Sequence, residues 1–410
     1  MMEMTTKSAQ ELAKERLDRM AAALNLEEPD KVPLRGFGGD IIPAYAGITQ
    51  KEFCYDYEKS LKAIEKFLKD FPFDSPGGSI PGLDGRAFSI AFAEFDDIAP
   101  NTTFITGPMH DALGDKYYRF PGREIDEDAT PQFLGGTFME PDEYDKLIEN
   151  PVKFIAETIL PRVCRNLETP RQAMATWVRL GMEFDRFSAA GRQLGAISAQ
   201  LGYPRFPMGG AYAPLDIIGD FLRGISNVVL DIRRYPDKVK KAAEALVDPI
   251  VNYGLSYKKM GFDLVMIPLH LNEYLSPKLY KEFYWPTLKE VILRLGKEGI
   301  RSWVFFEGHH EQHLETILEL PKGWGAAYFE KTDVVKAKEV LQGHTCVVGG
   351  IPISLIVTGT PAKIDEYIKS LLEQVKPGGG FMLSTSIGSA PADTPLENIT
   401  ALIEAVEKYG

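Results

Sequence analysis

The second half of the chain alternates short apolar runs with longer segments in which apolar residues recur every three or four positions. An apolar run of about five residues is typical of a buried strand, while a three- and four-residue period is typical of a helix packed on one face. The pattern predicts strands at 263–267, 302–306, 325–329, 345–349 and 380–384. It predicts helices at 277–297, 311–320, 333–341, 361–375 and 395–409.

Strands that alternate with helices over short connections indicate right-handed βαβ units and a parallel sheet. The first half is less regular. Its pattern predicts helices at 8–24, 57–71, 151–201 (broken near 168–170), 214–223 and 236–260. Strands are predicted at 32–34 and 206–212, with a β-like run at 86–92. Strands of this first half complete an α/β (β/α)₈ TIM barrel with an N-terminal helical extension. A doubly wound open sheet is the alternative, but no glycine-rich dinucleotide fingerprint follows any strand.

Residues 80–140 form the least regular region, punctuated by glycine and proline. Their phenylalanine and tyrosine content is too high for a disordered linker. We therefore expect an elaborated insertion or lid within one domain that covers residues 1–410.

Composition and net charge limit the kinds of molecule that this chain is expected to bind. Of the 410 residues, 44% are hydrophobic and 25% are charged, which suits a globular protein, and the net charge is −12. Nucleic acid and anionic membrane surfaces are poor partners for such a chain, because they need a basic footprint. No apolar run approaches the roughly 18 residues that span a bilayer. Three scattered cysteines and an N-terminus without a signal-peptide pattern predict a cytoplasmic protein.

The stretch 299–320 concentrates the candidate chemistry. Its apolar strand leads directly into Glu307, Gly308, His309 and His310, and His313 follows, so that three of the six histidines fall within five residues. In a parallel barrel, catalytic residues lie at the carboxyl ends of strands. The pattern therefore predicts an active site at this strand end.

Glu307 and His309 stand two residues apart, which places both side chains on one side of an extended strand end. With His270 from the preceding strand end, they make a nitrogen and oxygen triad of the kind that holds catalytic zinc. The alternative is that a strand-end histidine only packs or hydrogen-bonds a carbonyl. His313 is expected to be a solvated helix residue.

Other strand ends supply further candidates. Glu330 is either a catalytic base or a carboxylate at a helix N-terminus, and Asp40, after two glycines, is either a ligand contact or part of a turn. Tyr117 either covers the mouth of the barrel or belongs to the local core of the insertion. The remaining candidates for contact with substrate are Tyr212, His310 and Ser384. The strand ends hold few cations, which disfavours phosphoesters and polycarboxylates and favours a largely apolar ligand.

Several stretches resemble the uroporphyrinogen decarboxylase superfamily, which includes corrinoid-dependent methyltransferases. They read ERLDRMAAALNLEEPDKVPL, YDYEKSLKAIEKFLKD, APLDIIGDFLRGISNVVLDIRRYPDKVKKA, LSPKLYKEFYWPTLKEVI, VVGGIPISLIVTGTPAKIDEYIKSLLE and FMLSTSIGSAPADTPLENITALIEAVEKYG. The resemblance covers nearly the whole chain apart from about residues 80–140. It implies a (β/α)₈ barrel with a deep cleft at its C-terminal mouth.

Two branches of the superfamily differ from this chain. The decarboxylases resemble one another in an arginine-rich N-terminal loop, where this chain has only Arg35. The methylcobamide:coenzyme M enzymes carry a zinc-binding His-x-Cys pair and a later cysteine, and the matching residues here are Phe305, Glu307 and Ile387. The resemblance therefore does not imply zinc in that form, and a zinc ion would need other ligands, such as Glu307, His309 and His270.

What remains resembles the substrate:corrinoid methyltransferases. This resemblance implies that the chain transfers a methyl group from a small O- or N-methyl donor, such as a methoxylated aromatic, to the Co(I) of a separate corrinoid protein. The resemblance implies Glu307 as acid or ligand, His309 and His270 adjusting it, and Glu330 supporting them. The sequence does not decide between a monomer and a homodimer. The alternatives are a decarboxylase or other lyase on the same barrel, and a ligand-binding homologue without activity.

Overall fold

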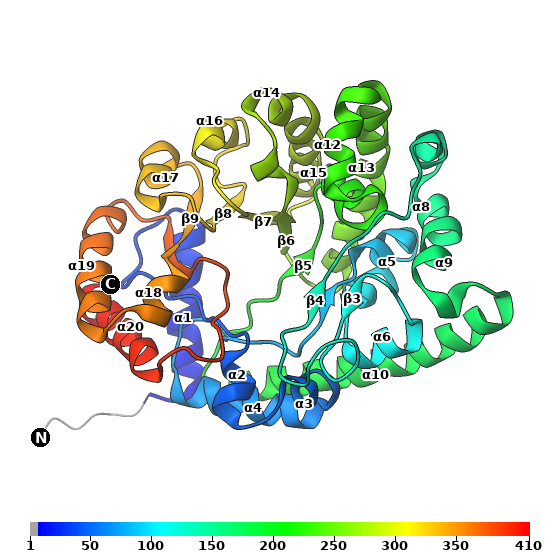
Figure 1. The fold of residues 1–410 in the computed structure, drawn as a ribbon. Helices are drawn as coiled ribbons and strands as arrows, with labels where there is room; N and C mark the ends of the chain where they lie inside the picture. The colour runs from blue at the N-terminus through cyan, green and yellow to red at the C-terminus, as the bar shows by residue number, and fades with distance from the viewer. Residues whose placement is uncertain (1–6) are drawn as a thin grey trace, which may run out of the picture. The chain divides into compact units, whose positions relative to one another are not determined.

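The computed structural model describes residues 7–410, whose helices and strands are labelled in Figure 1. The chain divides into two compact units. Unit 1 draws on Met1–Ile80, Ser188–Phe206 and Pro321–Gly410, and unit 2 on Pro81–Phe187 and Pro207–Leu320. Both units contain parallel strands that alternate with helices, so the predicted α/β fold is confirmed. Closure into an eight-stranded barrel stays a prediction. No helix among the described residues is long and apolar enough to cross a bilayer.

Unit 2 contains three parallel strands, β5 (Gly209–Gly210), β6 (Leu264–Leu269) and β7 (Arg301–Phe306). Nearly every residue of β6 and β7 is buried, which explains why the sequence shows continuous apolar runs there rather than alternation. The register pairs Leu269 with Phe306, so the two strands end side by side. That pairing decides which side chains meet at the carboxyl end of the sheet.

The segments that follow these strands are mostly helical. They are α11 (Pro214–Asp216), the π-helix η5 (Ile217–Arg223), α12 (Ile225–Arg234), α13 (Pro236–Lys259), η6 (Leu271–Tyr274), α14 (Pro277–Leu279), η7 (Tyr280–Tyr284), α15 (Trp285–Lys297), η8 (Glu311–His313) and α16 (Leu314–Ile317). The helix predicted at 311–320 is therefore only a 3₁₀ turn and one short α-helix, and α12 was not predicted.

The insertion belongs to unit 2 and is ordered around two small antiparallel pairs, β1 with β2 and β3 with β4. The β-like run predicted at 86–92 is instead helix α5. All six residues of α5 are buried, so the run has no polar face from which a helical period could be read. The bounds within the insertion are β1 (Leu83–Asp84), α5 (Arg86–Ala91), η1 (Ala99–Thr102), β2 (Phe104–Ile105), α6 (Gly107–Leu113), β3 (Tyr118–Arg119) and β4 (Gln132–Phe133). The segments after it are η2 (Pro141–Glu143), α7 (Tyr144–Glu149), α8 (Pro151–Phe154), η3 (Ile155–Ile159), α9 (Leu160–Val163), η4 (Arg165–Leu167) and α10 (Pro170–Gln200), and the residues of α10 from Ser188 on belong to unit 1.

Unit 1 contains the parallel strands β8 (Gly325–Phe329), β9 (Cys346–Ile351) and β10 (Phe381–Thr385). The strand predicted at 32–34 is only a parallel bridge between Leu34 and Leu383. It stays short because Pro33 has no N–H to donate to a ladder. The helices of unit 1 are α1 (Ala9–Leu24), α2 (Ile41–Ala46), α3 (Gln50–Tyr55), α4 (Tyr57–Asp70), α17 (Val334–Leu341), α18 (Ile353–Thr358), α19 (Pro361–Val375) and α20 (Leu396–Tyr409).

Candidate functional site

The residues directly after β6 and β7 meet at the carboxyl end of these strands. His270 follows β6 and Glu307 follows β7, and the register of the two strands places them side by side. The Nε2 atom of His270 lies 3.3 Å from the Oε1 atom of Glu307. Two of the three residues predicted to gather here are therefore in contact.

Two further side chains reach the same imidazole from the segment after β5. The Nδ1 atom of His270 lies 2.6 Å from the Oδ2 atom of Asp220, and the Tyr212 hydroxyl donates to the same oxygen over 2.8 Å. An ionised carboxylate only accepts hydrogen bonds, so Nδ1 carries a proton. The imidazole is thus held between two carboxylates, Asp220 on one side and Glu307 on the other.

This arrangement favours the charged form of the imidazole. Burial opposes the charge, but the carboxylates of Asp220 and Glu307 outweigh it and raise the pKa of His270 well above its ordinary value. The side chains of His270 and Glu307 remain 24% and 35% exposed. The site therefore presents an imidazole whose charged form is favoured and whose side chain is partly accessible.

Asp220 is a functional candidate that the sequence reasoning missed. It lies in the middle of the π-helix η5, inside a segment that was interpreted only as a helix. A sequence signal exists in PLDIIGD, where two aspartates stand four residues apart shortly after the strand end at Tyr212. Acidic residues within an otherwise apolar helix are unusual, because burial of a charge needs a partner.

His309, the third predicted zinc ligand, has no contact recorded with His270 or Glu307. The His309 side chain is 66% exposed and its Nδ1 atom lies 3.7 Å from Glu311, while Asp220 occupies Nδ1 of His270. Between residues 7 and 410, no group of three or more His, Cys, Asp or Glu side chains is arranged to hold a metal ion. Phe305, at one zinc position of the coenzyme M branch, has no metal-binding atom. Within that described range, the side chains that meet at His270 therefore do not form a set of zinc ligands.

His310 and His313 lie in the interior, so the expectation of a solvated His313 is wrong. The His313 ring stacks on Tyr280 with centroids 4.0 Å apart, and burial, with a smaller effect of Lys281, lowers the pKa of His313 to about 4. Burial also lowers the pKa of His310. Gly308, between β7 and these two histidines, has a φ of +68°, in the left-handed region that favours glycine.

Tyr117 belongs to the local core of the insertion. Its side chain is fully buried, and its hydroxyl donates to the carbonyl of Phe221 over 2.7 Å. Its ring meets Phe138 edge-on with centroids 5.3 Å apart. Of the two alternatives for Tyr117, the packing role is the one that this structure shows.

The other three candidates lie in unit 1. The Oδ1 atom of Asp40 accepts a hydrogen bond from Gln50 over 2.7 Å. Ser384 is buried and donates to the Tyr328 hydroxyl over 3.3 Å. Glu330 lines a cavity of about 720 Å³ that also contains residues following β9 and β10. Their roles in binding stay predictions.

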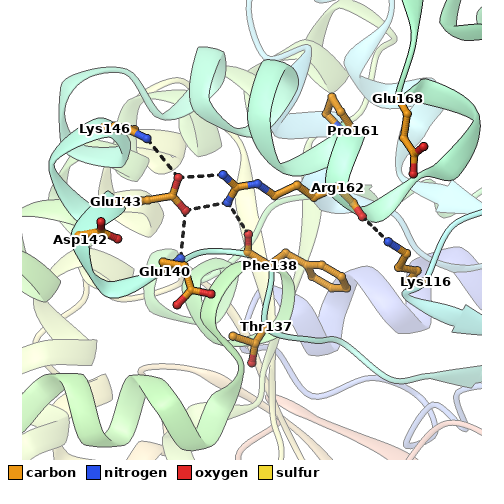
Figure 2. A pocket seen from close by; sticks show the side chains of 10 residues that line it. All are labelled: Lys116, Thr137, Phe138, Glu140, Asp142, Glu143, Lys146, Pro161, Arg162 and Glu168. Atoms are coloured by element: carbon orange, nitrogen blue, oxygen red, sulfur yellow. Dashed lines mark hydrogen bonds and ion pairs between the residues drawn. The ribbon is translucent and has the colours of Figure 1, made fainter.

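Unit 2 also has a polar hollow of about 740 Å³, lined by residues of the insertion and of the helical segments that follow it (Figure 2). At its centre, Glu143 accepts hydrogen bonds from Arg162 over 2.7 and 2.9 Å and from Lys146 over 3.2 Å. These cations, Arg162 foremost, lower the pKa of Glu143 to about 2. Glu143 and its two cations satisfy one another, which indicates a structural anchor rather than a reactive group.

Comparison with known proteins gives a consistent set of likenesses. The family model described as uroporphyrinogen decarboxylase (URO-D) matches residues 150–409, a range that includes Tyr212, Asp220, His270 and Glu307. The chain is 25% identical over 303 residues to the uroporphyrinogen decarboxylase of Idiomarina loihiensis, covering 70% of this chain and 80% of that enzyme. It is also 25% identical over 178 residues to the enzyme of Coxiella burnetii, covering 42% of this chain and 48% of the relative, about half of its length.

Among solved structures, a methyltransferase from Methanosarcina mazei shares the fold with a TM-score of 0.60. That comparison covers 98% of this chain and 99% of the other, with 16% sequence identity. An identity this low establishes a common fold and nothing finer.

Proposed function

Since the chain belongs to the uroporphyrinogen decarboxylase family, we propose that it is a methyltransferase that transfers a methyl group from the oxygen of a small methoxylated aromatic donor to the Co(I) of a corrinoid carried by a separate protein. The observation that carries the proposal is the position of the His270 imidazole between the carboxylates of Asp220 and Glu307. The fold shared with a methyltransferase supports it.

The chemistry has one demand that the site meets. The corrinoid supplies the electron pair that takes up the methyl group, and the C–O bond breaks with its electrons left on oxygen. The phenolate that a methoxyarene would release is a poor leaving group. A proton supplied to its oxygen as the C–O bond breaks therefore lowers the barrier. General acid catalysis of this kind contributes roughly 10²- to 10⁴-fold.

His270 is the acid that the geometry supports. Asp220 fixes the imidazole through Nδ1 and stabilises its charge, and this leaves the Nε2 proton for the leaving oxygen. In the protein without donor, Nε2 faces Glu307. The sequence reasoning preferred Glu307 as the acid; the geometry instead supports Glu307 as the second carboxylate that keeps His270 protonated.

The same feature favours O-methyl over quaternary N-methyl donors. A quaternary ammonium loses its methyl group and leaves as a neutral amine, which needs no proton. A general acid held between two carboxylates would have no task in that reaction. An ether oxygen does need the proton, so the donor class follows from the presence of the acid.

The experiment incubates the protein with a reduced corrinoid protein and a panel of methoxyarenes, and follows the spectral change from Co(I) to methyl-Co(III). Iodomethane, which methylates Co(I) without an enzyme, shows that the corrinoid is competent. We expect at least one methoxyarene to react with the wild-type protein and none with His270→Gln. Failure of every methoxyarene with a competent corrinoid would refute the proposal.

Decarboxylation is the second candidate, because the matched curated relatives are uroporphyrinogen decarboxylases. In this chain the loop before α2 holds one arginine, Arg35, which lies over the Tyr328 ring within unit 1 at 5.4 Å from its centroid. Release of carbon dioxide from a porphyrinogen, lost in His270→Gln, would favour this candidate over methyl transfer.

A further inference from the structure

The segment that follows β5 carries two aspartates directed at one histidine. Asp216 ends α11 and Asp220 lies in the π-helix η5, four residues later. Residues four apart lie on the same face of a helix, and π-helical turns occur frequently at functional sites. Asp220 holds the imidazole of His270, as described above, which leaves the task of Asp216 to be explained.

Asp216 holds the main chain of the same histidine. Its Oδ2 atom accepts a hydrogen bond from the backbone N–H of His270 over 3.0 Å, and its Oδ1 atom accepts one from the N–H of Leu271 over 3.0 Å. The Tyr284 hydroxyl adds a third donor, 2.5 Å from Oδ2. Asp216 is fully buried, so these bonds are shielded from water.

The local backbone explains why a side chain is needed there. After β6 the chain turns at His270, with φ −119° and ψ −47°, into the short 3₁₀ helix η6. The N–H groups of a helix's first turn have no acceptor within the helix, and a buried N–H group needs one. The Asp216 carboxylate accepts from both N–H groups of the turn, and so fixes where β6 ends.

We propose that Asp216 is a positioning residue, which sets the main chain of His270 while Asp220 sets its ring. The proposal deepens the methyl-transfer function and rests on it only for the consequence on catalysis. The two carboxylates of one segment then act together, since a ring orientation is defined only when the backbone that carries it is also held.

The charge of Asp216 agrees with this task. Three donors and no acceptor surround the carboxylate, which suits its ionised form. Burial and the neighbouring Asp220 raise the pKa of Asp216 to about 7, while the charge on His270 opposes the rise. The ionised carboxylate is therefore the form present above that pH.

The test is Asp216→Asn, which keeps the shape but turns an N–H₂ group toward a donor. We expect amide hydrogen exchange at His270 and Leu271 to accelerate about 10- to 100-fold, the range that corresponds to a lost hydrogen bond to a charged group. The kcat for methyl transfer should fall to a similar degree. The Kd of the methyl donor should change less than about twofold, because the side chain of Asp216 is fully buried and a methyl donor cannot reach it.

Asp231→Asn is the matched control. Asp231 is also a buried aspartate of unit 2, and it accepts from the Tyr144 hydroxyl over 3.0 Å and from Arg223 over 2.8 Å. The substitution Asp231→Asn should lower the free energy of unfolding. The rates of amide hydrogen exchange at His270 and Leu271, relative to those of other amides, should stay as in the wild type. Equal acceleration in both variants would reduce Asp216 to a stabilising residue and overturn the proposal.

Tyr284→Phe provides a second variant if Asp216→Asn does not fold. It removes one of three donors to Asp216 and should produce a smaller acceleration at the same two amides. Unchanged exchange in the variants that fold would overturn the proposal. Because exchange is measured without a donor or corrinoid, accelerated exchange in a protein that transfers no methyl group would uphold the positioning and refute the proposed function.

Discussion

Unit 2 contains two imidazoles that each lie between an aspartate and a glutamate. Around His270, the distances are 2.6 Å to Asp220 and 3.3 Å to Glu307. Around His110, in the insertion, they are 2.6 Å to Asp115 and 3.2 Å to Glu124. The partner carboxylates raise the pKa of both imidazoles against the effect of burial. By residue type and distance alone, the two clusters are indistinguishable.

They differ in what else their carboxylates hold. Asp115 also accepts the backbone N–H groups of Tyr117 and Tyr118 over 3.0 and 3.2 Å, and Glu124 accepts that of Phe120 over 3.1 Å. The His110 side chain is only 4% exposed, against 24% for His270. The His110 cluster therefore stabilises the backbone conformation of the loop that carries it.

The comparison teaches that the residue trio does not by itself make an active site. A second set of bonds commits both carboxylates of the His110 cluster to the backbone of the insertion. At His270, the imidazole itself keeps an accessible side, whereas the imidazole of His110 does not. Substitutions in the two clusters should therefore have opposite effects on activity and stability.

The largest expected effect is the loss of activity in His270→Gln. Removal of a general acid costs roughly 10²- to 10⁴-fold in rate. His110→Gln, the matched change in the other cluster, should retain most of the methyl-transfer rate measured at a temperature where both variants are folded. Comparable losses in the two variants would remove the distinction between the clusters.

Asp220→Asn should slow methyl transfer by roughly 10- to 100-fold, since a charged hydrogen bond to the acid is lost. The acid works in its protonated form, so the rate falls as pH rises through the pKa of His270. Loss of the Asp220 charge lowers that pKa, and the alkaline limb of the pH–rate profile should move to lower pH. Asp115→Asn should leave the limb in place; a limb unmoved in Asp220→Asn would argue against His270 as the acid.

His110→Gln should lower the free energy of unfolding by about 1–3 kcal/mol, because it leaves buried Asp115 without its strongest partner. Denaturant unfolding measures this directly. The m-value should not change, since the surface exposed on unfolding is the same. A free energy of unfolding equal to that of the wild type would show that the His110 cluster does not stabilise the fold.

The smallest effect is a pH dependence of that stabilisation. The folded pKa of His110 is raised above its unfolded value of about 6.5, so the charged brace contributes fully below that pH and is lost as pH rises through the folded pKa. The difference in unfolding free energy between wild type and His110→Gln should therefore be larger at pH 6 than at pH 9. A difference independent of pH would indicate that His110 stabilises only in its neutral form.

Much of the fold was accessible from the sequence. Helix α19 and strand β8 begin and end where the pattern predicted, and the succession of β6 and β7 correctly predicted that His270 and Glu307 become neighbours. These features depend on local period and on the rule that consecutive parallel strands lie side by side.

The errors arose where local pattern carries little information. The burial of His313 involves packing on Tyr280, a residue distant in the sequence, and the helix α5 has no exposed face to reveal its period. Asp220 was missed because nothing local distinguishes a π-helix from an α-helix, and its partner His270 is 50 residues away.

The sequence by itself determined the alternation of strands and helices and the strand end at which chemistry was sought. The tertiary structure decided which aspartate reaches His270, and which of the two Asp–His–Glu clusters remains open. Periodicity is a property of neighbouring residues, whereas burial, competition for hydrogen bonds and the resulting pKa values depend on contacts between distant ones. The proposal of His270 as the acid therefore depends on side chains that only folding brings together.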